Sequence, residues 1–304
     1  MKKLLSILAA LMLLAGFASA EEYAPKFAAP AGAPALVLAS LMAEGSEENF
    51  QLLAADTIAT AFASDSGFDF VIAPVNAGAK LFKAGKSTYR LAAVVTWGNL
   101  YIASQKENFS LQDINGGKIT LFGENTINAS VVLYSLEKAG IVPAEVEYLA
   151  GAQDTQKLLG DDPEAVVVTA EPALTGVKMQ KDNITSFSVQ DLLKDAAGME
   201  GYTQAGLFVR AETAAEHPEE TKAWLEAVKA SADKAETDLQ GMAAAAEKAG
   251  IMPKAKVAEL AIPGCSIRFV AAAEAREALE QTAAIDLSQF GGELPADDFY
   301  YAEN

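Results

Sequence analysis

Small and hydroxylated residues fill the stretch Gly123–Ser130, which follows a strand-like segment and precedes a helix-like one. It reads Gly-Glu-Asn-Thr-Ile-Asn-Ala-Ser, and Asn125 or Thr126 is the expected N-cap of the helix. Backbone N–H groups are free at a helix N-terminus, and the helix dipole there favours negative or acceptor groups of a ligand. The stretch therefore predicts a ligand-binding loop. An ordinary capped junction is the alternative, because most strand-to-helix loops bind nothing.

Similar junctions occur at three other places in the chain. Gly32–Ala35 and Pro74–Ala79 each open a helix-like segment with small residues. Glu171-Pro172 follows an apolar strand-like run, with proline at a favoured first helical position. In α/β sheets, ligands bind outside the carboxyl ends of strands, where such junctions collect. The repeated pattern strengthens the prediction of a binding site.

Residues suited to covalent or metal chemistry are scarce. His217 is the only histidine, lies in a Glu-His-Pro-Glu stretch, and is expected at the surface. Cys265 is the only cysteine, so no internal disulfide is possible, and we expect its thiol to be buried among apolar neighbours. Nucleophilic or metal catalysis needs a nucleophile–base pair or a cluster of ligands. The sequence thus favours a binding protein over an enzyme, and it indicates no cofactor and no metal site.

The N-terminus has the pattern of a signal peptide over residues 1–20. Lys2 and Lys3 precede the apolar run Leu4–Phe17, and Ala18–Ala20 offers the small residues of a cleavage site. An uncleaved membrane anchor is the alternative, but the run is short for a membrane span. We expect cleavage near Ala20, with no lipoprotein cysteine after it, and a soluble periplasmic or secreted chain.

The net charge of the chain limits the classes of molecule that it is expected to bind. The chain has 23 Lys and Arg residues against 41 Asp and Glu residues, a formal net charge of −18 at pH 7. Loss of Lys2 and Lys3 with the signal peptide makes the mature chain more acidic still. Such a charge disfavours nucleic acid and anionic membrane surfaces as partners. We expect the acidic residues to be spread over solvated helix faces, where they keep the protein in solution.

The segments that position the junctions alternate between strand-like and helix-like, which predicts an α/β fold with mainly parallel sheets. The expected strands are Lys26–Ala28, Phe50–Ala54, Phe68–Ala73, Leu91–Thr96, Leu100–Ser104, Lys118–Phe122, Val146–Leu149, Ala165–Thr169, Ile184–Ser188 and Tyr202–Val209. The expected helices are Ala35–Met42, Thr57–Ala63, one through Leu81, Asn128–Lys138, Gln153–Leu159, Pro172–Gln180, Gln190–Ala196, one or two within Glu219–Gly250, and Ala271–Ala284.

The stretch Tyr89–Ser104 is too long for one ordinary strand. Two strand-like runs in it are joined by Trp97-Gly98-Asn99. The pair could form a hairpin, or the chain could cross here from one lobe to another. The sequence leaves both possibilities open.

The order of the motifs resembles the substrate-binding proteins of bacterial ABC importers, in the nitrate, sulfonate, taurine and thiamine-precursor branch. The resemblance covers essentially the whole mature chain. It rests on the exported N-terminus and on Gly32–Ala35, Phe70–Ala77, Trp97–Tyr101, Gly123–Thr126, Val166–Pro172 and Pro295–Tyr300.

The resemblance implies a type 2 periplasmic-binding-protein fold with two lobes, hinge closure and a ligand in the cleft. Lobe one would comprise residues 21–99 and 207–304, and lobe two residues 100–206. The hinge would be Trp97–Tyr101 and Gln204–Leu207. The implied ligand-binding residues are Ala33, Pro34, Ala35, Asn76, Ala77, Trp97, Asn99, Thr126, Asn128, Ala129, Ser130 and Glu171.

The implied partners are a small-molecule ligand and the permease of an ABC importer, and we expect a monomer. None of the expected cleft loops carries Arg or Lys. This weakens the case for a sulfonate or another oxyanion as the ligand, and a neutral heteroaromatic ligand is equally open. A sensor or scavenger of the same fold, a relative of the thiamine-precursor synthases and a purely structural exported protein are the alternatives.

Overall fold

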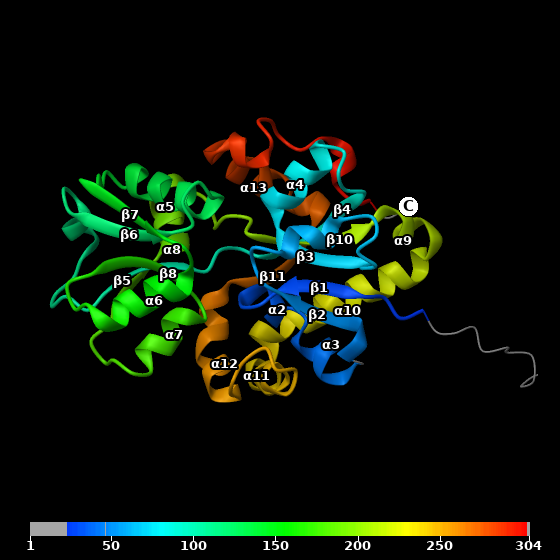
Figure 1. Cartoon of the computed structure of the whole chain (residues 1–304), viewed down its shortest axis with the longest axis horizontal. Helices are drawn as coiled ribbons and strands as arrows, with labels where there is room; N and C mark the ends of the chain where they lie inside the picture. The colour runs from blue at the N-terminus through cyan, green and yellow to red at the C-terminus, as the bar shows by residue number, and fades with distance from the viewer. Residues whose placement is uncertain (1–22, 46, 303–304) are drawn as a thin grey trace, which may run out of the picture.

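The computed structural model describes residues 23–45 and 47–302, so the expected signal peptide lies outside the described residues. The strands of this part form two mixed sheets that lie side by side along the long axis, with helices on both faces of each (Figure 1). We call them sheet A, with strand order β11-β4-β10-β3-β1-β2, and sheet B, with order β7-β6-β8-β5-β9. The expected α/β class is confirmed.

Sheet A draws its strands from both ends of the chain. They are β1 (Phe27–Pro30), β2 (Phe50–Leu53), β3 (Phe70–Pro74), β4 (Tyr89–Thr96), β10 (Ala205–Arg210) and β11 (Ile267–Ala271). β1 is buried along its length and β3 is buried up to its half-buried last residue, Pro74, as expected for strands covered on both faces. One face is covered by α4 and α13, the other by α3, α10, α11 and α12.

Sheet B is built from one continuous part of the chain. Its strands are β5 (Leu100–Ser104), β6 (Lys118–Phe122), β7 (Glu145–Leu149), β8 (Val166–Ala170) and β9 (Thr185–Ser188). α5 and α8 cover one face and α6 and α7 the other (Figure 1). The apolar core under α5 and α8 continues into the core under α13 and includes Trp97 and Tyr202.

Most strands are followed by a helix or a short helical turn, β4 is followed directly by β5, and four helices follow β10. The helices are α2 (Ala33–Leu36), α3 (Ala39–Glu44), α4 (Val75–Lys83), α5 (Ile127–Lys138), α6 (Ala152–Asp161), α7 (Ala173–Lys178), α8 (Val189–Ala197), α9 (Ala211–Glu216), α10 (Pro218–Thr237), α11 (Leu239–Lys248), α12 (Ala255–Ala261) and α13 (Ala272–Ile285). Short 3-10 turns include η2 (Ile58–Phe62), η4 (Ile262–Cys265) and η5 (Leu287–Phe290). Within the described residues, none of these helices has both the length and the hydropathy to cross a membrane.

The chain passes between the sheets twice. β4 ends at Thr96 in sheet A and β5 begins at Leu100 in sheet B, so the stretch around Trp97 is a crossing and not a hairpin. The return runs from the end of α8 to β10, which begins at Ala205, two residues before the expected start of the second part of lobe one. The predicted lobe boundaries therefore lie close to the change of sheet, and they remain a prediction.

Strand direction differs from the expected mainly parallel sheets. β1 pairs with β2 and β3 in parallel, but β10 is antiparallel to both β3 and β4, and β5 is antiparallel to β8 and β9. The reason is geometric. A strand that enters from the other sheet starts at the edge where its neighbours end, so Ala205 lies opposite Pro74, and Leu100 lies opposite Ala170.

Several secondary-structure elements also differ from those predicted from the sequence. β11 was not expected from the sequence, because this five-residue edge strand exposes Arg268 and Ala271 and lacks a buried-strand pattern. The helix expected over Ala35–Met42 is divided into α2 and α3, and the one over Thr57–Ala63 is the short turn η2.

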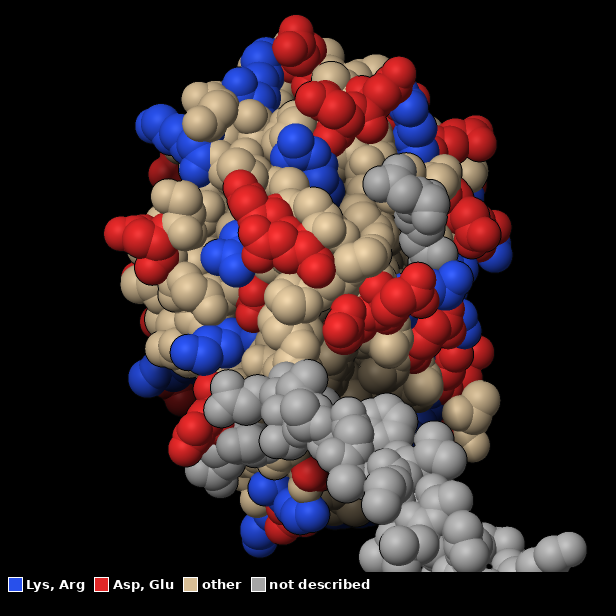
Figure 2. Space-filling model, turned by 90° about the vertical axis from the view of Figure 1, so that its right-hand side faces the viewer, with Lys and Arg blue, Asp and Glu red and all other residues tan. Residues whose placement is uncertain are grey.

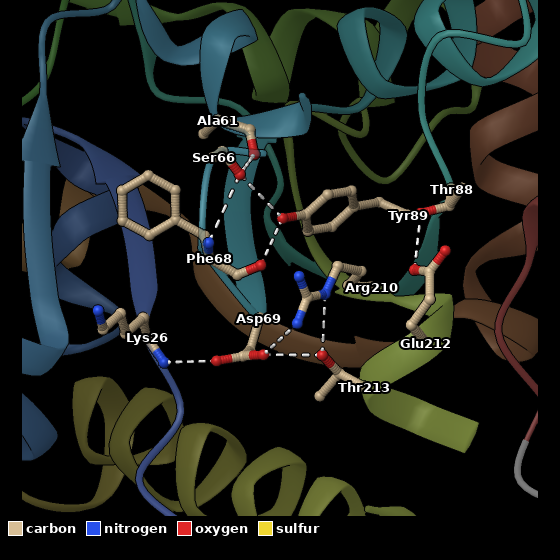
Figure 3. Close-up of polar contacts among 10 residues, drawn as sticks. All are labelled: Lys26, Ala61, Ser66, Phe68, Asp69, Thr88, Tyr89, Arg210, Glu212 and Thr213. Atoms are coloured by element: carbon tan, nitrogen blue, oxygen red, sulfur yellow. Dashed lines mark hydrogen bonds and ion pairs between the residues drawn. The ribbon is translucent and has the colours of Figure 1, made fainter. Parts of the chain in front are cut away.

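A polar network fastens the end of sheet A that lies away from sheet B (Figure 3). The buried Asp69 carboxylate accepts from the Lys26 backbone N–H at 2.9 Å and from the Thr213 hydroxyl at 2.7 Å. The same carboxylate pairs with Arg210 at 3.1 Å, while the Tyr89 hydroxyl donates to the Phe68 carbonyl at 2.5 Å. The network ties β1, β3, β4, β10 and α9 together. Figure 2 shows acidic and basic side chains interspersed over the part of this end that the grey atoms leave visible.

Candidate functional site

The two crossings bring the ends of both sheets together. β3 and β4 end at Pro74 and Thr96, at the edge of sheet A where β10 starts, and β8 ends opposite the start of β5 in sheet B. Only Trp97-Gly98-Asn99 separates β4 from β5. We call this region the intersheet junction. It comprises the crossing stretches 97–99 and 198–204 and the loops that end β1, β3, β6 and β8.

Asn99 lies at the centre of the intersheet junction and joins its two sides through a hydrogen-bond relay. Gln204 Nε2 donates to Asn99 Oδ1 at 2.8 Å, and Asn99 Nδ2 donates to the Glu171 carbonyl at 2.6 Å. The Glu171 backbone N–H donates in turn to the Asn99 carbonyl at 3.0 Å. Asn99 is 5% exposed, so each of these groups depends on the others for its partner.

Glu171 is 7% exposed and directly precedes Pro172, the N-cap residue of α7. Its carboxylate accepts from the Thr175 backbone N–H and from the Thr175 hydroxyl, each at 3.0 Å. Burial raises the pKa of Glu171, and the bonds from Thr175 oppose this shift only in part. The carboxylate is therefore used by the first turn of α7, and the role of Glu171 in ligand binding remains a prediction.

Residues from the C-terminal part of the chain complete this side of the intersheet junction. The Tyr101 hydroxyl donates to the Gly264 carbonyl at 3.1 Å, and burial together with the Glu171 charge raises the pKa of Tyr101. A Cβ on Gly264 would come within 2.9 Å of both Glu171 Cγ and the Tyr101 hydroxyl. Glycine is needed here because η4 lies directly against these two side chains.

Asn76 and Ala77 open α4 on the sheet A side, and both are half-buried. The Val75 backbone N–H donates to the Gln204 carbonyl at 3.1 Å, which places the first turn of α4 beside the return crossing. Asn76 Oδ1 and Gln204 Oε1 are buried, and neither has a hydrogen-bond partner among the described residues. Gln204 was assigned to the hinge by sequence but not to the site.

The Gly32–Ala35 junction contributes less side-chain surface than expected. Ala33 and Ala35 are 1% and 0% exposed and pack in the core of sheet A, while Pro34 is half-buried. Gly32 has a φ of 99°, which glycine adopts readily and which starts the four-residue helix α2. Any contact that Ala33 or Ala35 makes with a ligand must come from the backbone.

On the sheet B side, Thr126 is the N-cap of α5, as one of the two predicted choices. Its hydroxyl accepts from the Ala129 backbone N–H at 3.4 Å and donates to the Gly123 carbonyl at 2.6 Å. The Ala129 side chain is 4% exposed and packs in the core. The polar groups of this loop are thus partly used by its own backbone.

Asn128 and Ser130 contact the sheet A side. Asn128 Oδ1 accepts from the Tyr202 hydroxyl at 3.0 Å, and the Ser130 hydroxyl donates to Asp286 Oδ2 at 2.8 Å. The bonds from Ser288 and Ser130 lower the pKa of Asp286. Gln289 adds a bond from its side-chain amide to the Asn125 carbonyl at 3.0 Å. These contacts connect α5 with the end of α13 and η5.

Trp97 is 6% exposed and belongs to the core that runs between the sheets. Its Nε1 donates to the Arg268 carbonyl at 2.9 Å, and the Arg268 guanidinium carbon lies 4.4 Å from the centre of the indole ring. An exposed cation therefore lies beside the first crossing, although the expected cleft loops carry none. Sequence reasoning missed Arg268 because it missed β11.

The two residues best suited to nucleophilic or acid–base catalysis, Cys265 and His217, are not placed to act on a ligand at the intersheet junction. Cys265 is fully buried, and burial together with the Glu171 charge raises the pKa of its thiol. His217 is half-buried and stacks on Tyr23 with 4.0 Å between ring centres, beside α9 at the far end of sheet A. Within the described residues, no group of His, Cys, Asp and Glu side chains could hold a metal ion.

A pocket of about 320 Å³ lies elsewhere, at the edge of sheet A opposite the intersheet junction. Its walls include Arg90, Ala211, Pro218, Glu219 and Tyr300, from the start of β4, from α9 and α10, and from the C-terminal segment. The pocket shares none of the predicted ligand-binding residues.

Known proteins of similar structure share this architecture. A crystal structure described as an ABC transporter from Parabacteroides distasonis has a TM-score of 0.78 and 18% identity, covering 92% of this chain and 99% of that chain. The periplasmic aliphatic sulphonate binding protein SsuA from Escherichia coli has a TM-score of 0.70 and 14% identity, covering 92% of each chain. The alkanesulfonate-binding protein SsuA from Xanthomonas axonopodis pv. citri, bound to MOPS, has a TM-score of 0.63 and 14% identity, covering 92% and 96%. The expected two-lobed fold is confirmed.

Comparison of the sequence itself gives the family. No curated protein matches the chain. The model of the NMT1/THI5 like family matches residues 56–238, which is more than half of the chain and includes β4, β5, both crossings and most of the intersheet junction. The protein therefore belongs to the NMT1/THI5-like family.

Proposed function

We propose that this protein is an extracytoplasmic solute-binding protein that captures a small molecule at the intersheet junction and delivers it to the permease of an ABC importer. The similar structures described as sulphonate-binding proteins and as an ABC transporter support this proposal. The signal-peptide pattern and the acidic composition are compatible with export and with a soluble carrier.

The observation that carries the proposal is the convergence of loops from both sheets on two short crossings. Loops that follow β1 and β3 come from one side, and loops that follow β6 and β8 come from the other. A ligand held between them contacts both lobes, so its binding energy favours the closed arrangement of the lobes. In this proposal residues 21–99 and 207–304 move as lobe one against residues 100–206, about Trp97–Tyr101 and Gln204–Leu207.

The test is a thermal-shift screen of residues 21–304 with sulfonates, nitrate, pyrimidines, flavins, purines and amino acids. A compound at about one hundred times its dissociation constant stabilises the folded state by about 2.7 kcal/mol. For a chain of this size the melting temperature then rises by several degrees. Refolding from denaturant before the screen removes any compound that copurifies.

A pair of variants on α4 locates the site. Ala77→Trp places a large side chain at the first turn of α4 in the intersheet junction, whereas Ala84→Trp places it at the exposed C-terminal end of the same helix. We expect Ala77→Trp to abolish the ligand-induced shift and Ala84→Trp to retain it. Equal shifts in both variants, or no shift with any compound in the screen, would contradict the proposal.

A further inference from the structure

We infer that the intersheet junction selects a ligand that presents N–H donors, such as an amide, an amidine or an amino-substituted heterocycle, with Asn76 and Gln204 as the residues that recognise it. The inference rests on the proposed solute-binding function and gives the chemistry of its ligand. It disfavours the sulfonates and other oxyanions, which offer only acceptor oxygens.

The first observation is a pair of buried acceptors from adjacent segments. Asn76 Oδ1 and Gln204 Oε1 are shielded from solvent, and neither has a partner among the described residues. The bond from the Val75 N–H to the Gln204 carbonyl holds the two segments together at the start of α4. Buried polar groups are nearly always hydrogen-bonded, so two such oxygens in one candidate site call for a donor from outside the chain.

The second observation fixes which atom of Gln204 points away from the relay. The Glu171 carbonyl can only accept, so the Asn99 atom that contacts it at 2.6 Å must be Nδ2. Asn99 Oδ1 is then the atom 2.8 Å from Gln204, and the Gln204 atom that faces it must be the donor Nε2. The remaining atom, Oε1, is an acceptor by necessity, because rotating either amide would oppose two donors or two acceptors.

The third observation is the charge around these acceptors. The residue Glu171 is 7% exposed, its backbone carbonyl belongs to the relay, and its carboxylate takes part in none of the ion pairs found among the described residues. The cation beside the first crossing, Arg268, is stacked on the Trp97 ring. An anion would meet two acceptor oxygens here, whereas a neutral or cationic N–H donor would complement both.

The experiment compares compounds that share a ring and differ in one substituent. Benzamide and benzamidine carry N–H donors, benzoate and benzenesulfonate carry only acceptor oxygens, and nitrate and ethanesulfonate represent small oxyanions. Each is tested at millimolar concentration by thermal shift, and binding is quantified by calorimetry. We expect benzamide or benzamidine to raise the melting temperature and the four oxyanions to leave it unchanged.

Two near-isosteric variants remove the acceptors. Asn76→Leu and Gln204→Met should each weaken binding of benzamide or benzamidine by about ten-fold, the effect of one lost buried hydrogen bond. Asn76→Leu should also leave the melting temperature of the ligand-free protein unchanged or raise it, because the oxygen that it removes has no partner. A merely structural Asn76 would instead lower it. Gln112→Met, at an exposed glutamine in the connection between β5 and β6, is the matched control for Gln204→Met.

The outcomes separate this inference from the proposed function. Binding of an oxyanion in place of the amide and the amidine would overturn the inference and leave solute binding intact. Binding of benzamide or benzamidine with unchanged affinity in both variants would also overturn it. If none of the six compounds raises the melting temperature, the inference fails, while the broader screen still decides solute binding.

Discussion

At the scale of single residues, the intersheet junction is a set of buried polar groups whose partners come from distant parts of the chain. Asn99 accepts from Gln204 and donates to Glu171, and the Glu171 carboxylate accepts from Thr175 in the first turn of α7. Such a relay is stable only when all its members are in place, because each buried group that loses a partner costs about 1–3 kcal/mol. The polar residues at this site therefore serve both the fold and any ligand.

The buried carboxyl of Glu171 should make the stability of the protein depend on pH. Burial raises its pKa, so the folded protein holds this proton more tightly than the unfolded chain does. The free energy of unfolding should then fall as the pH rises from the ordinary carboxyl pKa through the raised one. Glu171→Gln keeps an acceptor for the Thr175 N–H and removes the titration. We expect the melting temperature of the variant, relative to the wild type, to increase with pH over this range.

Glu124→Gln is the control, because Glu124 is an exposed carboxyl in the Gly123–Ser130 loop. Its melting temperature should follow that of the wild type at every pH. A difference between Glu171→Gln and the wild type that stays constant with pH would show that the Glu171 carboxyl does not titrate differently in the folded protein.

At the scale of elements, the first crossing is held tightly against the return crossing. Gly98 has a φ of 94°, and a Cβ there would lie 2.6 Å from Tyr202 Cε1 and 2.9 Å from Gln190 Cγ. Tyr202 is fully buried, so its ring has little freedom to move aside. Only glycine satisfies both the backbone conformation and the close approach of the ring.

We expect Gly98→Ala to lower the free energy of unfolding by about 1–3 kcal/mol, through overpacking added to backbone strain. Gly140→Ala is the matched control, because Gly140 has a φ of 73° and no atom within 4 Å of the position of a Cβ. Chemical denaturation of both variants separates the two causes. If Gly98→Ala costs no more than Gly140→Ala, the contact with Tyr202 contributes nothing.

The helices and strands also show which local structures could be predicted from sequence patterns. Thr126 as the N-cap of α5 could be predicted, because capping depends on residues within one turn. β11 could not, since a short edge strand with an exposed arginine carries little local signal and forms by pairing with β4. Missing β11 also hid Arg268, the cation that covers Trp97.

At the scale of the whole molecule, contacts outside the first crossing hold the two lobes in their present arrangement. Ser130 on α5 bonds to Asp286 after α13, and Tyr101 on β5 bonds to Gly264 in η4. Asp286 also accepts from the Ser288 hydroxyl, two residues along the chain, at 2.6 Å. Ser130→Ala and Ser288→Ala therefore remove a bond to the same carboxylate, and only the first bond connects α5 with the segment after α13.

Spin labels at Val142→Cys and Leu294→Cys report the separation of the lobes, because these exposed positions lie beside sheet B and after η5. Cys265 should stay unlabelled, since its thiol is fully buried and its pKa is raised. By double electron–electron resonance, we expect Ser130→Ala to shift the ligand-free population toward longer distances and Ser288→Ala to leave it unchanged. Identical distance distributions in the two variants would contradict a role for the Ser130 contact in closure.

By itself the sequence determined the alternation of strands and helices, the acidic composition, the signal-peptide pattern and the small-residue junctions that open helices. These properties depend on neighbouring residues, so periodicity, capping and composition were enough to predict them. Only the tertiary structure decided that Ala33, Ala35 and Ala129 face the core, and that Gln204, Tyr101 and Gly264 join Asn99 and Glu171. The reason is that the two crossings bring together residues far apart in the chain, and the partner of a buried polar group is set by that packing and not by its neighbours in sequence.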